Sequence, residues 1–196
     1  LSQQNSESQS VSSKGGAQTT SFEVSIDGYD ENRHFFLSYY FRDNYEQAME
    51  ALPYIASGVT INRIEVWVTN KRGNYDQARN IVALVDLGEN DPVHVLNPQW
   101  AANRDRAPHN KANSLYETLT GSYASIRDIQ QTSAVMQSVG GMDSGEDYEK
   151  VESARLLNSG EYTLNSALGY ISLKSALNQD EVLAVAYEYT YGGQVY

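Results

Sequence analysis

Carboxylates are the side chains of this sequence with the clearest capacity for chemistry, and they gather in two places. The first group contains Asp86, Glu89 and Asp91. The second group contains Asp143, Glu146, Asp147 and Glu149. Hard cations such as calcium accept oxygen ligands from polar loops of this kind. Because neither group has the spacing of a calcium-binding loop, the first group is only the nearest candidate for a metal site, and we predict no metal and no cofactor.

Other groups that could react are sparse. His34, His94 and His109 have no metal-ligand spacing and lie beside no recognised nucleophile motif. The sequence contains no Cys, which excludes thiol chemistry and disulfide bonds. We therefore predict that the chain is not an enzyme. The alternative is a hydrolase with paired carboxylates, which needs a cleft that holds two carboxyl groups about 5–9.5 Å apart.

Tyrosine is unusually frequent, with 15 residues against 4 Phe and 2 Trp. Its side chain joins an apolar ring to a polar hydroxyl, so it suits surfaces that meet water or another protein. Trp67 and three residues near the C-terminus, Tyr187, Tyr189 and Tyr191, form a candidate binding platform. Such a platform predicts contact with a partner protein or, as an alternative, a surface module for carbohydrate binding or adhesion. A tryptophan on a half-buried strand is more often packed in the core, which is the simpler interpretation of Trp67.

The charge balance is acidic, with 25 Asp and Glu against 14 Lys and Arg and a formal net charge of −11. This balance repels phosphate backbones, and no cluster of basic residues opposes it, so we do not expect nucleic-acid binding. No apolar run approaches the roughly 20 residues of a membrane-spanning helix. The hydrophobic content of 40% suffices for a buried core, and the sequence predicts a soluble chain.

The elements that would position these residues begin after a polar N-terminal segment. Residues 1–21 are rich in Ser, Gln, Thr and Gly and predict a linker or an extended arm. We expect residues 22–196 to form a single domain, which begins with a short alternating strand over residues 22–26. Over residues 31–51 apolar residues recur every three or four positions and predict a helix, while the aromatic run 34–41 leaves a strand open.

Residues 59–69 have the clearest strand pattern in the chain. Its apolar phase slips from odd to even positions, so we predict a β-bulge near Asn62 and Arg63 that keeps both halves facing the core. Residues 81–87 are almost continuously apolar and predict a strand that is buried on both faces. An irregular stretch rich in Asn, Pro and charge follows over residues 88–111.

Three short helices are predicted in the middle of the chain, over residues 113–158 approximately. The first starts at a capping box formed by Ser114 and Glu117. The second ends at the glycine pair 140–141. The third starts near Ser144, where the second carboxylate group favours a helix N-terminus electrostatically.

Strands return near the C-terminus, over residues 161–164, 169–173 and 182–191. Gly192 and Gly193 have the character of a two-residue hairpin turn. Strands thus bracket a helical middle. This order predicts an α+β fold with a mainly antiparallel sheet, or a β-sandwich with a helical insertion.

Three long runs of the sequence resemble a known family. They are residues 29–71 (YDENRHFFLSYYFRDNYEQAMEALPYIASGVTINRIEVWVTNK), residues 79–89 (RNIVALVDLGE) and residues 161–196 (EYTLNSALGYISLKSALNQDEVLAVAYEYTYGGQVY). Together with the Gly-Gly-Ala sequence at 15–17 they extend the similarity from about residue 14 to the end. In this order the runs resemble the SprA/Sov family of Bacteroidetes.

The resemblance implies a function. Proteins of this family are very large outer-membrane β-barrels that form the conduit of the type IX secretion system, and they are linked to gliding motility and adhesin export. The resemblance implies that these 196 residues are one soluble insertion of such a protein, on the extracellular or the periplasmic face. The partners it implies are other segments of the same chain and secretion accessory proteins. It brings no catalytic residues.

Overall fold

The computed structural model describes residues 28, 30–71, 73, 75–85, 110–111 and 113–196. The chain divides after Asp30 into two units, and the second unit, residues 31–196, contains the described helices and strands. The predicted arm, the predicted strand at 22–26 and the carboxylate group at 86, 89 and 91 lie outside the described residues.

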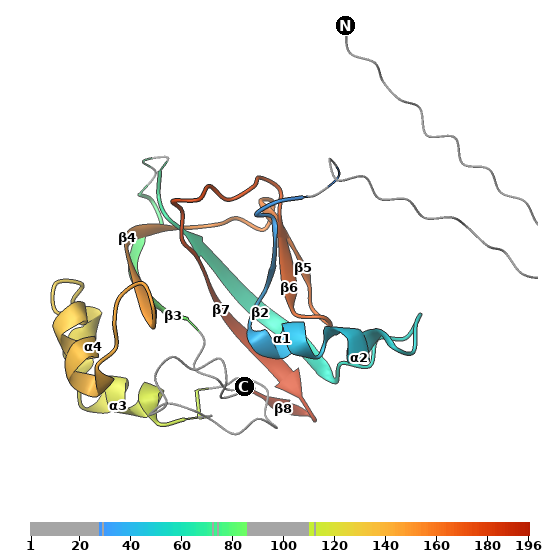
Figure 1. Cartoon of the computed structure of the whole chain (residues 1–196), viewed down its shortest axis with the longest axis horizontal. Coiled ribbons are helices and arrows are strands. Elements are labelled where there is room, and N and C mark those ends of the chain that lie inside the picture. The colour runs from blue at the N-terminus through green and yellow to red at the C-terminus, as the bar shows by residue number, and fades with distance from the viewer. Residues whose placement is uncertain (1–27, 29, 72, 74, 86–109, 112) are drawn as a thin grey trace, which may run out of the picture. The chain divides into compact units, whose positions relative to one another are not determined.

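A five-stranded sheet organises the second unit (Figure 1). Its strands lie in the order β3, β4, β2, β7 and β8, and each neighbouring pair is antiparallel. The strands are β2 (Val59–Val68), β3 (Arg79–Leu84), β4 (Tyr148–Leu156), β7 (Leu183–Tyr191) and β8 (Gln194–Val195). β2 and β7 form the longest pairing, whereas β4 meets β2 only at Trp67 with Leu156 and Val68 with Arg155.

A second, three-stranded sheet lies against the β2–β7 pair. It contains β1 (His34–Phe36), β6 (Tyr170–Leu173) and β5 (Tyr162–Asn165), in that order. The main core fills the space between the two sheets, with Val66 and Ile171 fully buried and Phe41 4% exposed. Alternate residues of β2 and β7 point into this core because side chains alternate across a strand.

The helices are short and fall into two places. α1 (Tyr39–Asp43) and α2 (Tyr45–Met49) follow β1, and α1 inserts Phe41 into the main core. α3 (Leu115–Gly121), the 3₁₀ helix η4 (Ala124–Arg127) and α4 (Thr132–Gly140) lie between β3 and β4 in sequence. These three cover one face of the β3–β4 pair through a cluster of four buried residues: Leu115, Met136, Met142 and Tyr148. Among the described residues no helix is long and apolar enough to cross a bilayer.

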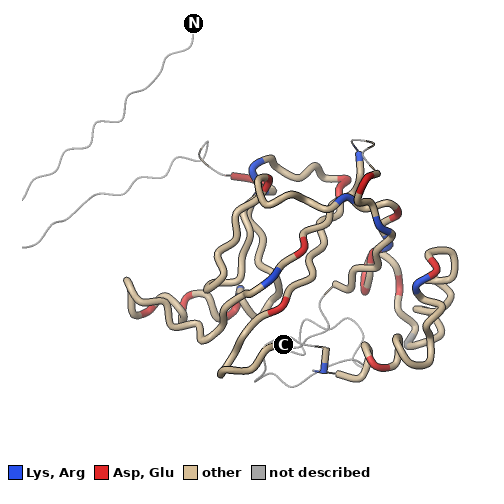
Figure 2. Tube along the Cα trace, turned by 180° about the vertical axis from the view of Figure 1, so that it is seen from behind, with Lys and Arg blue, Asp and Glu red and all other residues tan. Residues whose placement is uncertain are grey.

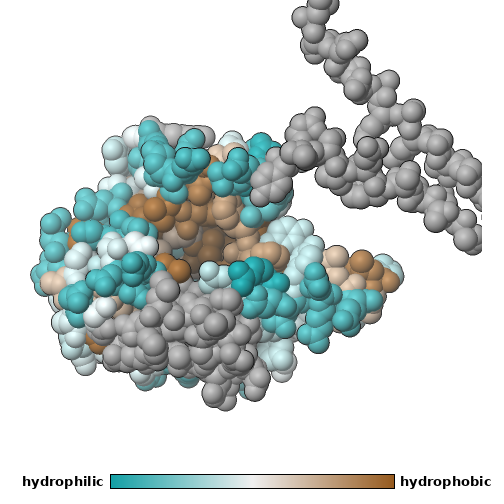
Figure 3. Space-filling model, viewed as in Figure 1, coloured by the Kyte–Doolittle hydropathy of each residue, from teal (hydrophilic) through white to brown (hydrophobic). Residues whose placement is uncertain are grey.

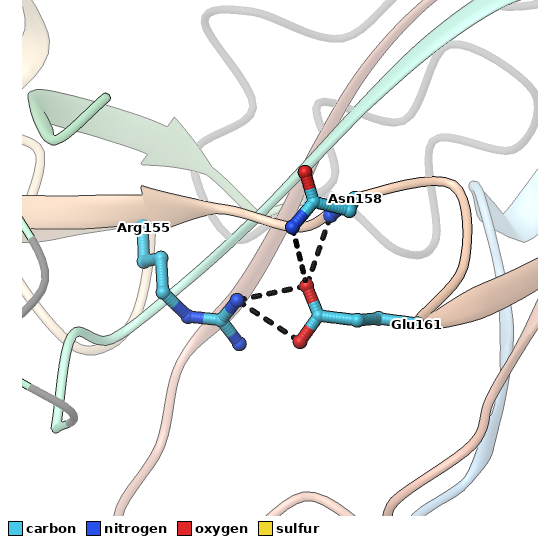
Figure 4. Close-up of polar contacts among 3 residues, drawn as sticks. All are labelled: Arg155, Asn158 and Glu161. Carbon is cyan, nitrogen blue, oxygen red and sulfur yellow. Dashed lines mark hydrogen bonds and ion pairs between the residues drawn. The ribbon is translucent and has the colours of Figure 1, made fainter. Parts of the chain in front are cut away.

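A polar clamp joins the end of β4 to the start of β5 (Figure 4). Both carboxylate oxygens of Glu161 accept hydrogen bonds from Arg155 Nη1, at 3.0 and 2.9 Å. The Oε2 atom also accepts one from the backbone N–H of Asn158 at 3.0 Å. The Arg155 and Glu161 side chains are only 17% and 28% exposed, so the pair is partly shielded from water and links the two sheets.

The predicted α+β architecture with a mainly antiparallel sheet is confirmed. The pairing of β2 with β7 shifts between Ile61 and Arg63, which confirms the predicted bulge. Over residues 31–51 the single predicted helix is wrong. The strand alternative holds for His34–Phe36, and two short helices separated by Asn44 follow it.

The third predicted helix is also wrong, because residues 148–156 form the strand β4. Tyr148 and Val151 are three apart, a spacing typical of a helix face. In β4 they lie on opposite faces, and each face is buried: Tyr148 against the helices, and Val151 against Trp67. The helical middle therefore ends at Gly140, and not near residue 158.

Two local predictions need smaller corrections. Ser114 precedes α3 but makes no capping bond with its side chain, and Asn113 Oδ1 accepts the N–H of Leu115 instead, at 3.0 Å. Of the strand predicted at 81–87, residues 81–84 lie in β3 and are half-buried instead of buried on both faces. Val85 follows the strand and is 51% exposed, and residues 86 and 87 lie outside the described residues.

Candidate interaction site

An open hollow of about 970 Å³ lies beside β7. We call it the hollow. Its described walls come from four parts of the chain. These are β1 with the start of α1, residues 82–85 at the end of β3, Tyr116 and Leu119 of α3, and residues 183–187 of β7. Figure 3 shows apolar residues gathered in this depression, with polar residues on described parts of its rim. Depressions with an apolar floor and a polar rim are typical of binding sites.

The outer edge of β7 carries backbone groups into this region. The N–H of Thr69 donates to the carbonyl of Val182 at 3.1 Å, which fixes the phase of the β2–β7 ladder. In an antiparallel ladder the backbone groups of alternate residues point toward the partner strand or away from it. Those of Ala184 and Ala186 therefore point to β2, and those of Leu183 and Val185 point to the outer edge.

β8 covers a different part of that edge. It pairs with β7 at Thr190 and Tyr191, and the backbones of Tyr189 and Tyr196 exchange two hydrogen bonds of 3.1 and 2.9 Å. No described residue pairs with the outer edge at Leu183 or Val185. Among the described residues, the edge thus changes from paired to unpaired within one strand.

The charges around the hollow differ from those of the chain as a whole. Apart from tyrosines, its described ionisable residues are His34 and Arg42, and none is a carboxylate. His34 Nδ1 and Ser172 Oγ lie 2.8 Å apart, and Arg42 Nε donates to Asp43 at 3.0 Å. Figure 2 shows the Asp and Glu positions spread along the described trace, not gathered in one stretch. Because Arg42 is paired with Asp43, the described walls of the hollow are mostly apolar and carry little net charge, in a chain that is acidic as a whole.

Aromatic residues stack around the end of β7. The Tyr189 and Tyr196 rings are stacked with their centroids 5.3 Å apart. Tyr40 of α1 is half-buried, and its pKa is raised, first by burial and second by the nearby Tyr191. Burial favours the neutral phenol, so the Tyr40 side chain stays uncharged over the physiological pH range.

The four residues of the predicted platform do not form one exposed surface. Trp67 is 6% exposed and packs against Val151 and Ala154 of β4, with the Arg79 guanidinium 5.6 Å from its ring centroid. Tyr187 lies on the face of the sheet opposite Trp67. It pairs with Ile64 of β2, and Ile64 and Trp67 are three residues apart, so their side chains point to opposite faces. Tyr189 is 2% exposed and Tyr191 is 43% exposed.

The second carboxylate group makes a turn. Asp147 Oδ2 accepts the backbone N–H of Asp143 at 2.8 Å, and the loop then enters β4. Within the described ranges no three His, Asp or Glu side chains are close enough to hold a metal ion.

The sequence contains a signal for the hollow in the apolar run of β7. Residues 182–187 (VLAVAY) are continuously apolar, whereas a strand with one solvated face alternates. Such a run indicates apolar surroundings on both faces of β7. Whether its edge is paired depends on strand order, which the residue pattern does not contain.

A family model described as a motility related/secretion protein, SprA_N, matches residues 1–180 of the chain. In the comparison with curated proteins, no protein matches the chain.

Proposed function

Because the chain belongs to the SprA_N family of motility related and secretion proteins, we propose that it is an interaction domain of a large cell-envelope protein. That protein exports other proteins through the outer membrane and supports gliding, as the resemblance to type IX translocons of Bacteroidetes implies. The domain contributes binding and structure, not catalysis. Its partners are other segments of the same large polypeptide and accessory proteins of secretion.

The observation that carries this proposal is the hollow. Interfaces between proteins are built around an apolar centre from which charged residues are depleted, with aromatic residues enriched. The hollow has that composition in a chain of net charge −11. A hydrolase with paired carboxylates would require two carboxyl groups in its cleft, and the described walls contribute none.

The test is a charge substitution in the hollow of the parent protein. Val85 and Tyr116 line the hollow and are each 51% exposed, so Val85→Lys with Tyr116→Lys places two charges there at little cost to folding. We expect export of secreted proteins and gliding speed to fall at least about tenfold, the effect of losing a binding hot spot.

Tyr54→Lys is the matched control, since Tyr54 is 73% exposed and lies outside the described walls of the hollow. It should leave export and gliding unchanged. Normal export by the double variant, with circular dichroism and protein level equal to the control, would show that the hollow is not the functional surface.

A further inference from the structure

The open part of the β7 edge has the chemistry of a site for an added strand. Leu183 and Val185 direct their N–H and C=O groups to the outer edge, and no described residue pairs with them there. Both residues also line the hollow, where the surroundings are largely apolar. Unpaired N–H and C=O groups along the edge of a sheet are a template for pairing with another strand.

The existing partner on this edge defines a direction and a register. β8 runs antiparallel to β7 after the turn at Gly192 and Gly193, which both have positive φ, at 57° and 80°. The two bonds between Tyr189 and Tyr196 mark a hydrogen-bonded position of the β7–β8 ladder. Hydrogen-bonded positions recur every second residue, so a strand that continues this ladder meets the outward groups of Val185 and Leu183.

The side chains around the edge restrict what such a strand contains. The odd-numbered residues Leu183 and Val185 pack against the main core, and Ala184 packs beside Trp67 on the other face. An added strand therefore has apolar neighbours on both faces. The described walls of the hollow hold no carboxylate, and their guanidinium, that of Arg42, is paired with Asp43, so they favour a strand with few charged residues.

We propose that the outer edge of β7 at Leu183 and Val185 binds an extended segment of the same large polypeptide. The segment runs antiparallel to β7 in the register of β8, with mostly apolar residues and few charges. This inference rests on the proposed function, in which the domain works inside a longer protein. A segment of the same polypeptide is favoured over a separate one because β8 already lies on this edge and a tethered strand has a high effective concentration.

Hydrogen exchange tests the edge directly. In the 196-residue chain we expect the amides of Leu183 and Val185 to exchange at least about tenfold faster than those of Ala184 and Ala186, which face β2. In the purified parent protein the Leu183 and Val185 amides should slow by about tenfold or more, while Ala184 and Ala186 change little. Protection of Leu183 and Val185 already in the 196-residue chain, or equally fast exchange in both proteins, overturns the proposal.

A photo-cross-link identifies the source of the strand. Ala186 lines the hollow and is exposed, so Ala186→p-benzoylphenylalanine in the parent protein places a reactive ketone beside the edge. We expect a cross-link within the parent polypeptide, and the same group at Tyr54 should give none to that segment. A cross-link from Ala186 to a separate protein overturns the proposal. A second result also overturns it: the substitutions at Val85 and Tyr116 impair export, but the Leu183 and Val185 amides stay unprotected in the parent protein. That result leaves the proposed function intact.

Discussion

Gly169 shows how closely the β5–β6 turn is fitted to α1. Its φ is +64°, a region that residues with a Cβ rarely adopt, and a Cβ built there would lie 2.1 Å from Phe41 Cδ1. Its carbonyl accepts the N–H of Leu37 at 2.9 Å, which ties the β5–β6 turn to the start of α1. The absence of a side chain therefore lets Phe41 enter the main core.

Gly169→Ala should lower the free energy of unfolding by about 3 kcal/mol, because strain at positive φ and overpacking add. Gly160→Ala is the control, since a Cβ there meets nothing within 4 Å. Urea denaturation of both variants measures the difference. Equal stability of the two would mean that Phe41 does not pack on Gly169.

At the scale of single elements, β4 contains a β-bulge where it pairs with β3. Arg79 pairs with Ala154 and Ile81 with Val151, so β4 has one residue more than β3 in this interval. Ser153 lies in the extra stretch with φ at +51°, and its N–H is accepted by Asn80 Oδ1 at 2.9 Å. The bulge bends β4 so that Val151 and Ala154 both contact Trp67.

Ser153→Gly should raise the free energy of unfolding by about 0.5–1 kcal/mol, because glycine adopts this φ without steric cost. Ser153→Val should lower it by more than about 1 kcal/mol, since a β-branched residue is an outlier there. Thermal and urea unfolding of the two variants measure whether each change raises or lowers the free energy of unfolding. A stabilising valine would contradict the bulge.

The bulges explain which strands the sequence could predict. In β2 the phase slip is visible because both halves of the strand face the same core, so the bulge near Asn62 was predictable. In β4 the two faces contact different clusters, and buried residues at 148, 151 and 154 imitate a helical repeat. Residue patterns record burial, and they do not record which cluster buries a residue.

For the candidate site, the sequence predicts the residue types but not their arrangement in space. Tyrosine excess and the apolar run of β7 are properties of the sequence, and both indicate contact surfaces. Of the two interpretations of Trp67, exposed platform or packed core residue, the structure supports the second. The hollow itself depends on strands far apart in the chain, β1, β3 and β7, so no local pattern could reveal it.

On the scale of the whole described unit, two halves meet at a narrow seam. One half contains the three-stranded sheet together with β2, β7 and β8 around the main core, and the other contains β3, β4 and the helices α3, η4 and α4. The ladder between them consists of two residue pairs, so the side chain of Trp67 and the clamp of Arg155 with Glu161 supply much of the connection.

Trp67→Ala should cost about 3–5 kcal/mol, the usual loss for a buried tryptophan, and should separate calorimetric unfolding into two transitions. Met136→Ala is the control, because Met136 is fully buried in one half alone. It should lower the temperature of unfolding without dividing the transition. A single transition in Trp67→Ala would show that the halves are coupled elsewhere.

Because Trp67 lies between the two halves, its fluorescence can report on their separation. An indole ring held away from water emits at shorter wavelength than one in solvent, and Trp67 is 6% exposed between the halves. The chain has one other tryptophan, Trp100, so Trp100→Phe leaves a single emitter. Its emission maximum would then report, in real time, whether the two halves separate when a partner occupies the domain.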